Sequence, residues 1–418
     1  MDTTSRLGRI ATTTLGTLLA AAVWVPSLHL FFDADASEAG RTRVRETLRE
    51  TQLALWEDEA ARASVLARMR GTNAEWDFMG RTFLVLALAN DALAHPARRV
   101  RDLAVMDRIL EETLRLERER GQAHFLMDYV HAGRFVDPSG RSVFVDGEIA
   151  LMLAARQRVA RSERWRGPLA RRVAHIEAQM RRGPVTSAES YPDECWTFCN
   201  TLALAAVRTS DAVTGEDHGA LLGAWVASAR AHLIDPDTGM LVSSYRRDGT
   251  HLDGPEGSSV FMAAHALQVI DPAFAAEQYA LARRHLGADL AGFAWAREWP
   301  DGWRGPPDVD SGPVVPLVDA SAGASGMALL GAAAFDDGAY RRGLHRSLGL
   351  AAFPIRDGGG LRYAASNQVG DAVLLYALSQ GPLWRAIGPP PSPANDALAT
   401  GTRSHPASIR DHGGFGGN

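Results

Sequence analysis

Cysteine is scarce in this sequence: Cys195 and Cys199 are the only two among 418 residues. Two thiols exclude a disulfide scaffold, and at a helical spacing of four residues they could oxidise only with strain. A zinc site would need two further ligands, and the nearest histidines in sequence, His175 and His218, lack the spacing of a zinc finger. The sequence therefore disfavours both a disulfide and a metal site.

Motifs that mark several common enzyme classes are also absent. The chain has no G-x-G-x-x-G before a predicted helix, no P-loop, no G-x-S-x-G and no H-E-x-x-H. The net charge of −5 gives no electrostatic reason to expect a nucleic-acid partner. Arginines in 41–49 and 98–120 alternate with acidic residues at helical spacing, which is typical of solvated helix faces.

One long uncharged run is present, from Ile10 to Phe32 after Arg6 and Arg9, and it is long enough to span a bilayer. The alternative is a cleavable signal with Ala-Asp-Ala at 34–36 as its cleavage site. The run exceeds the usual apolar region of a signal peptide, which favours an uncleaved anchor. Both interpretations place the body outside the cytoplasm, either anchored in the cell membrane or released to the periplasm or medium, because the arginines stay inside.

Elsewhere, apolar residues recur with helical spacing through most of the chain. Glycine and proline mark the ends of these segments, for example at Pro96, Gly121 and Gly183. About a dozen helices of moderate length would pair as six hairpins. The predicted helices are 42–70, 76–95, 99–120, 145–163, 166–182, 192–214, 218–233, 257–270, 272–287, 318–334, 336–350 and 367–379.

Strand signals are few. Residues 239–254 alternate on both sides of Asp248-Gly249, which predicts a short β-hairpin, and 135–145 give a weaker signal for another. The loop 294–323 is rich in Gly, Pro and Trp, and loops of this length in compact domains are usually functional.

These elements predict an all-α (α/α)6 toroid with short β-hairpin insertions over residues 37–388. An anchor or signal segment (1–36) precedes it, and a disordered Pro- and Gly-rich tail (389–418) follows. A linear stack of helical repeats is the alternative, but no fixed-period repeat supports it.

The first candidate site is the stretch YPDECWTFCN at 191–200. Pro192 suits the first position of a helix, and Asp193 and Glu194 would lie in its first turn, where capping alone could explain them. Cys195 and Cys199 would share one helix face, near Asn200. A thiol close to a helix N-terminus lies in a positive potential that favours the thiolate; a buried, inert cysteine is the alternative.

Other candidates are carboxylates and aromatic residues elsewhere in the chain. Glu148 opens an otherwise apolar helix, and an inner helix of a toroid would direct it into the cavity; as a charge near a helix start it needs no function. Asp308 and Asp310 lie in a loop walled by Pro and Gly, where they could bind polar groups or form Asx turns. Trp196 could wall an apolar pocket or simply pack.

The chain resembles the linalool dehydratase-isomerase family in five motifs that occur in the same order. The resemblance extends over roughly residues 140 to 392. It implies an (α/α)6 fold and an exported protein that forms a ring-like homo-oligomer. It also implies cofactor-free acid/base chemistry that dehydrates or isomerises monoterpene alcohols in an apolar pocket. The motifs are YPDECWTFCNTLALAAV, HLIDPDTGMLVSSYRRDG, DPAFAAEQY, the Asp-x-Asp-x-Gly of 308–312, and LRYAASNQVGDAVLLYAL.

The resemblance aligns Cys199, followed by Asn200, with the second of two family cysteines. The first family cysteine falls at Ser190 and the neighbouring glutamate at Tyr191. Glu148 stands where the family has a histidine, and Phe261 stands where the family has a tyrosine. Cys195 has no family counterpart.

We therefore expect a lyase or isomerase acting on an apolar alcohol, with Glu148 as acid or base, Cys199 as its partner and Tyr191 orienting the oxygen. A carbohydrate-active (α/α)6 enzyme with paired carboxylates and a non-catalytic envelope protein that kept the fold remain alternatives. The expected catalytic residues are Cys199, Glu148, Tyr191, Asp193 and Glu194; the expected substrate contacts are Ser190, Cys195, Trp196, Asn200, Tyr245, Phe261, Asp308 and Asp310.

Overall fold

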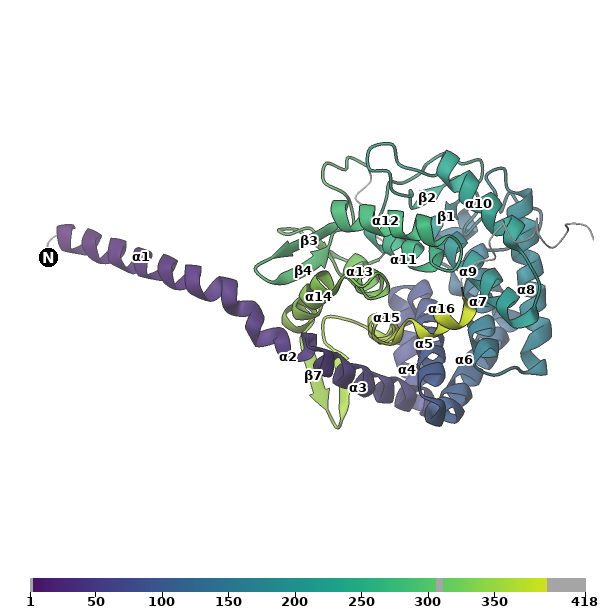
Figure 1. The fold of residues 1–418 in the computed structure, drawn as a ribbon, viewed down its shortest axis with the longest axis horizontal. Helices are drawn as coiled ribbons and strands as arrows, with labels where there is room; N and C mark the ends of the chain where they lie inside the picture. Colours follow the sequence, from purple (N-terminus) through teal and green to yellow (C-terminus); the bar gives the residue numbers. More distant parts are fainter. Residues whose placement is uncertain (1–2, 306–310, 389–418) are drawn as a thin grey trace, which may run out of the picture.

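The computed structural model describes residues 3–305 and 311–388. Within these ranges, six helices form an inner ring in which each helix contacts the next, and the last contacts the first. Figure 1 looks down this ring. The closed circuit of contacts confirms the predicted toroid and excludes the linear stack. The inner helices are α5 (Ala74–Ala94), α7 (Val143–Val159), α9 (Thr197–Thr214), α11 (Gly257–Leu267), α13 (Ala322–Ala334) and α15 (Gln368–Ser379).

Outer helices alternate with the inner ones along the described chain. An inner helix such as α7 is buried on nearly all sides, whereas an outer helix buries one stripe and exposes arginines on the other face. Because each outer helix returns the chain, all inner helices run in the same direction. The outer helices are α3 (Glu38–Glu57), α6 (Arg99–Arg120), α8 (Glu163–Arg182), α10 (Gly219–His232), α12 (Pro272–His285) and α14 (Gly338–Ala351).

Four predicted helices have wrong bounds. The segments 145–163 and 318–334 are helical over 143–159 and 322–334, the second because a strand precedes the helix. The segment 42–70 is two helices, because Asp58 ends α3 and its carboxylate caps α4 (Glu59–Thr72) by accepting from the Ala61 amide at 3.0 Å. The helix predicted from 192 begins at Thr197 instead. Residues 191–194 form a tight turn before it, in which Asp193 has a φ of 55°.

The strand β1 (Cys195–Trp196) follows that turn and pairs antiparallel with β2 (Ser244–Tyr245). The prediction that Cys195 and Cys199 share a helix face is therefore wrong, since Cys195 lies in a strand. The predicted hairpin around Asp248-Gly249 is present, with Tyr245 bridged to His251. The weaker hairpin signal at 135–145 is wrong, because a turn there leads directly into α7.

Four further strand pairings were not predicted. A small sheet runs in the order β3-β4-β6-β5, and β7 pairs with β8 in a separate hairpin. Strands therefore occupy parts of the loop 294–323 that the sequence left irregular. Their bounds are β3 (Gly287–Leu290), β4 (Phe293–Ala296), β5 (Val314–Val315), β6 (Ala320–Ser321), β7 (Pro354–Asp357) and β8 (Gly360–Tyr363).

The short helix α16 (Pro382–Ile387) closes one end of the ring. The Leu383 amide donates to Asn90 Oδ1 at 2.9 Å, and the Trp384 ring stacks on His265 with centroids 5.5 Å apart. Asn90 and His265 lie near the C-terminal ends of α5 and α11. The end that α16 covers is therefore the C-terminal end of the inner helices.

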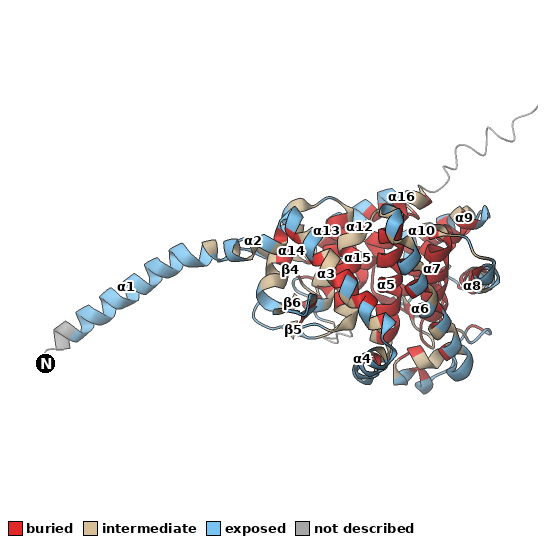
Figure 2. Ribbon diagram, turned by 90° about the horizontal axis from the view of Figure 1, so that it is seen from below, coloured by how far each residue is buried: buried red, intermediate tan, exposed pale blue. Residues whose placement is uncertain are grey.

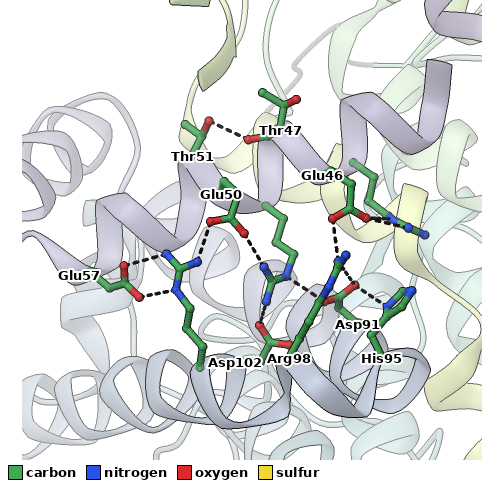
Figure 3. A network of polar contacts seen from close by, with 12 residues as sticks. Glu46, Thr47, Glu50, Thr51, Glu57, Asp91, His95, Arg98 and Asp102 are labelled. Carbon is green, nitrogen blue, oxygen red and sulfur yellow. Dashed lines mark hydrogen bonds and ion pairs between the residues drawn. The ribbon is translucent and has the colours of Figure 1, made fainter. Parts of the chain in front are cut away.

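Ion pairs fasten α3 against α5 and α6 (Figure 3). Buried Arg49 of α3 binds Asp91 of α5 at 2.8 Å and also Asp102 of α6. Burial raises the pKa of Asp102 to about 6, and Arg49 opposes that rise. At the exposed end of the network, Arg101 pairs with Glu50 and Glu57. These contacts hold the first outer helix where the ring closes.

The helix α1 (Thr3–Ser27) projects away from the side of the ring (Figures 1 and 2). Residues 6–36 are long and apolar enough to cross a membrane, a property that an N-terminal signal sequence shares. Two short helices, η1 (Leu28–Phe32) and α2 (Asp33–Ala36), join α1 to the body. The other short helices are η2 (Pro96–Arg98), η3 (Gln122–Phe125) and η4 (Asp128–Ala132).

Candidate functional site

The sequence-predicted candidates Glu148 and Cys199 meet at the N-terminal end of the inner ring. Glu148 lies in the second turn of α7, and Cys199 lies in the first turn of α9. Glu75, in the first turn of α5, belongs to the same group, because its charge acts on both Glu148 and Cys199. Three neighbouring inner helices thus bring acidic and thiol groups together at the end of the ring opposite α16.

Glu148 is a buried carboxyl with one oxygen engaged. Its Oε2 accepts a hydrogen bond from Thr82 Oγ1 at 2.6 Å, whereas Oε1 finds no hydrogen-bond partner among the described residues. Burial raises the pKa of Glu148 to about 8; the Thr82 bond opposes the rise and the Glu75 charge adds to it. At neutral pH the group therefore carries a proton, which is the state required of a general acid.

Cys199 is a neutral thiol in this environment. Burial is the main cause that raises its pKa well above the usual value, and the charges of Glu75, Glu148 and Glu194 add to it. A hydrogen bond with the Ser190 side chain acts in the opposite direction. Of the two interpretations of Cys199, burial therefore favours the buried, neutral cysteine over a thiolate promoted by the helix N-terminus.

Tyr191 connects the loop before α9 to the start of α5. Its hydroxyl donates to Glu75 Oε1 and accepts from the Met127 amide at 2.9 Å. Its ring stacks on Tyr129 of η4, with centroids 4.2 Å apart. Burial and the neighbouring Glu75 raise the pKa of Tyr191, so the phenol stays protonated as a hydrogen-bond donor.

Two hydrogen bonds to its carboxylate place Glu194 beside these groups. Tyr129 Oη donates to Glu194 Oε1 at 3.4 Å, and Trp196 Nε1 donates to the same oxygen. Ser190 Oγ accepts from the Trp196 amide at 3.2 Å. The structure therefore gathers Ser190, Tyr191, Glu194 and Trp196 with Cys199 and Glu148.

The Asn200 side chain makes three hydrogen bonds to the backbone near this group. Its Oδ1 accepts from the Ala188 amide at 2.9 Å, and its Nδ2 donates to the carbonyls of Ala188 and Trp196, each at 3.0 Å. The amide thus holds the segment that carries Ser190 and Tyr191 against α9.

Asp193 and Cys195 border the group, and their own partners lie outside it. The Asp193 carboxylate pairs with Arg246 at 2.6 Å, and both side chains are more than a third exposed. Cys195 is fully buried in β1 opposite Tyr245, and burial followed by the Glu189 charge raises its pKa. Tyr245 is fully buried as well, and its hydroxyl donates to Ser187 Oγ at 2.8 Å.

Phe261 points in another direction. It lies in α11 and packs edge-on against Tyr279 of the outer helix α12, with ring centroids 6.2 Å apart. Its ring therefore contributes to the contact between inner and outer helices. Asp308 and Asp310 lie outside the described residues.

Three members of the group were missed from the sequence: Glu75, Thr82 and Tyr129. Glu75 comes two residues after Asn73, whose side chain caps α5 by accepting from the Glu75 amide. A glutamate at such a position is usually explained by the helix dipole. A usable signal existed, however, because Glu75 and Glu148 both stand near the start of an apolar inner helix.

Among residues 3–305 and 311–388, no group of three or more His, Cys, Asp or Glu side chains could hold a metal ion. The nearby groups instead offer proton donors and acceptors: a protonated carboxyl, a neutral thiol, a phenol and a carboxyl that receives its hydrogen bond. This set suits proton transfer to and from a bound molecule.

Comparison with known proteins adds two findings. A GH76 alpha-mannanase of Bacteroides thetaiotaomicron aligns over 73% of this chain and 86% of its own, at 10% identity and a TM-score of 0.46. The sequence model of the family described as linalool dehydratase/isomerase matches residues 148–369, more than half of the chain. That match begins at Glu148 and includes Cys199. The chain therefore belongs to the linalool dehydratase/isomerase family.

Proposed function

We propose that this protein is an acid/base lyase or isomerase acting on an apolar, isoprenoid-like alcohol. The observation that carries the proposal is Glu148, a buried carboxyl that keeps its proton at neutral pH and leaves Oε1 without a partner among the described residues, in the electrostatic reach of Cys199. Family membership supports the reaction class. The substrate class rests on the activity that the family resemblance implies.

Glu148 supplies the first proton. It protonates the hydroxyl oxygen of the alcohol, the C–O bond breaks, and water leaves with the bonding electron pair. The carboxyl group becomes a carboxylate, which stabilises the allylic cation that remains. A buried acid with a pKa near 8 is matched to this task at neutral pH.

Glu75 is the base in this proposal. It removes a proton from the carbon next to the cation, and the C–H electrons form the double bond. In isomerisation, water adds back at the other end of the allylic system and releases a proton instead. The proton on Glu75 then returns to Glu148, which restores both groups. Tyr191 holds Glu75 in place through its hydroxyl.

Cys199 acts as a neutral donor. Its raised pKa rules out a resting thiolate, so the thiol donates a weak hydrogen bond to the substrate oxygen and supports Glu148. Ser190 orients the sulfur through its hydrogen bond.

We also propose that α1 remains as an uncleaved anchor, with the ring outside the cytoplasm. Arg6 and Arg9 precede the apolar helix, which matches the positive-inside rule. Residues 28–36 pack on the body through ion pairs of Asp33 with Arg346 and Asp35 with Arg356, as expected of a retained segment. A ring-like homo-oligomer, implied by the family resemblance, is part of the same proposal.

The test is turnover of linalool and longer acyclic allylic isoprenoid alcohols by the full chain, with alkene and isomeric alcohol measured by gas chromatography. Glu148→Gln and Cys199→Ala should both lose most turnover. Asp211→Asn is the matched control, since Asp211 is another buried carboxyl whose pKa burial raises, but it lies near the C-terminal end of α9 and accepts from the His218 amide at 3.0 Å.

Equal turnover in Glu148→Gln and in the wild type would overturn the proposed acid. Cleavage of an oligosaccharide, with no reaction on any alcohol, would favour the carbohydrate-active alternative. Inactivity on both classes would favour a non-catalytic protein that kept the fold.

A further inference from the structure

The segment between α1 and the ring is packed firmly against three elements of the body. His29 of η1 packs on Gly292 in the β3–β4 turn, and Phe32 lies edge-on to Phe293, with centroids 5.9 Å apart. Arg346 of α14 binds Asp33 at 2.6 Å and donates to the Gly292 carbonyl at 2.9 Å. The direction in which α1 leaves the body is therefore fixed by packing.

Large apolar side chains are exposed around this junction. Leu290 at the tip of the β3–β4 hairpin is 67% exposed, and Phe353 just before β7 is 63% exposed. Leu350 at the end of α14 and Phe31 of η1 are exposed as well. We call the surface formed by Leu30, Phe31, Leu290, Leu350 and Phe353 the junction face. Soluble proteins seldom expose a contiguous apolar patch of this kind, and such a patch usually marks a surface that binds a partner or a membrane.

Aromatic and basic residues flank the junction face. Trp24, near the end of α1, stacks on Phe31 with centroids 6.5 Å apart, and tryptophan is enriched where a bilayer meets water. Arg41 of α3 lies close to Arg341 and Arg342 of α14, whose charges lower its pKa after burial, the main cause. Three guanidinium groups beside an apolar surface suit anionic lipid headgroups.

We propose that the junction face rests in the surface layer of the bilayer that α1 enters. The occupant is lipid: the apolar tips Leu290, Phe353 and Phe31 enter the headgroup region, and Arg41, Arg341 and Arg342 bind lipid phosphates. The inference rests on the proposed anchor, and it adds that the ring is held against the membrane in one orientation.

That orientation follows from where the junction lies. The segment 28–36 contacts α14 and α3, which are outer helices, so α1 leaves from the side of the ring (Figures 1 and 2). With the junction face on the bilayer, the ring axis lies along the membrane. The N-terminal end of the ring, which carries Cys199, then faces along the lipid surface and not toward it.

The test is spin-label accessibility in the full chain, reconstituted in nanodiscs of zwitterionic lipid with and without an anionic phospholipid. Single labels are placed by Leu290→Cys and Phe353→Cys. Val136→Cys is the matched control, an exposed apolar position next to Asp137, which pairs with Arg182 of α8. Leu15→Cys, within α1, reports the anchor itself. Both native cysteines are buried, and the parent protein gives the labelling background.

We expect the ratio of oxygen to nickel-chelate accessibility at Leu290 and Phe353 to be several-fold higher than at Val136. Anionic lipid should raise this accessibility ratio further. The double variant with Arg341→Gln and Arg342→Gln should lack the increase that anionic lipid causes. A low ratio at Leu290 with a high ratio at Leu15 would overturn this inference while the anchor stands. A low ratio at Leu15 would overturn both. A label at Leu290 shielded from both reagents would show a second protein copy on the junction face instead.

Discussion

The Tyr191 hydroxyl donates to Glu75, 116 residues earlier in the chain, and so joins the loop before α9 to the first turn of α5. The same oxygen accepts from the Met127 amide at 2.9 Å. One side chain therefore fixes three segments around the acidic group that includes Glu148.

Tyr191→Phe removes both bonds. We expect the free energy of unfolding to fall by about 1–3 kcal/mol, because a half-buried amide and a half-buried carboxyl oxygen each lose a partner. Turnover should fall more than stability explains, since Glu75 loses its fixed position. Chemical denaturation and steady-state rates measure the two effects. Tyr340→Phe is the control: its buried hydroxyl donates to the Trp295 carbonyl at 2.7 Å, away from Glu75. Equal rate losses in both variants would contradict a special role for Tyr191.

Glu148→Gln should change how stability depends on pH. The folded-state pKa of Glu148 is about 8, above its ordinary value of 4.5, so between these pH values unfolding releases a proton. This group's contribution is fully present below pH 4.5 and is lost as pH rises, by about 1.4 kcal/mol per pH unit. Between pH 5 and 8, the free energy of unfolding of the wild type should therefore fall by up to about 4 kcal/mol more than that of Glu148→Gln.

Urea denaturation of both proteins at several pH values measures that difference. Asp102 and Asp371 also have raised pKa values, but both proteins contain them, so their contributions cancel. Parallel stability curves would show that Glu148 is ionised in the folded protein. The rate should likewise fall above pH 8 in the wild type, where the acid loses its proton.

Substitutions of the two cysteines should have different effects on turnover. Cys199→Ala is expected to lower turnover strongly, and Cys195→Ala to leave it nearly unchanged, because Cys195 faces β2 and the Glu189 side of the loop. Each substitution should cost about 1 kcal/mol of stability, a common value for a small buried change. A rate loss in Cys195→Ala that matches Cys199→Ala would show that both thiols act only through packing.

Arg49→Met tests how the ring is closed. Without the guanidinium, Asp102 remains buried without its cation, and the loss of one partner of a buried pair typically costs about 3–5 kcal/mol. The loss should be smaller at pH 5 than at pH 8, because the pKa of Asp102 is about 6 and a protonated Asp102 needs no cation. Arg101→Met, which removes exposed pairs, should cost no more than about 1 kcal/mol. Equal losses in the two variants would contradict the closing role of Arg49.

The fold could be predicted because its signals are local. Apolar periodicity and the Gly and Pro stops place nearly every inner and outer helix, and alternation of the two kinds is enough to predict a toroid. The break at Asp58 was missed because the apolar pattern continues through it. The sheet β3-β4-β6-β5 was missed because its strands are short and pair across a long loop.

The site was only partly predictable, and the start of α9 shows why. Pro192, Asp193 and Glu194 have the local preferences of a first helical turn, yet Cys195-Trp196 pairs with Ser244-Tyr245, which delays the helix to Thr197. That pairing joins segments about fifty residues apart, and no local rule detects it. The same limit applies to Glu75, whose meeting with Tyr191 depends on the closed ring.

The short helix α16 has a kinetic consequence. Its contacts with Asn90 and His265 close the ring at the end away from Cys199. We therefore expect a molecule that binds near the thiol to enter and leave at the N-terminal end of the ring. In the proposed reaction, the alkene and the water have to leave by this end before the next alcohol binds, so the alkene should inhibit binding of the alcohol. Progress curves would then slow early, well before the substrate is used up.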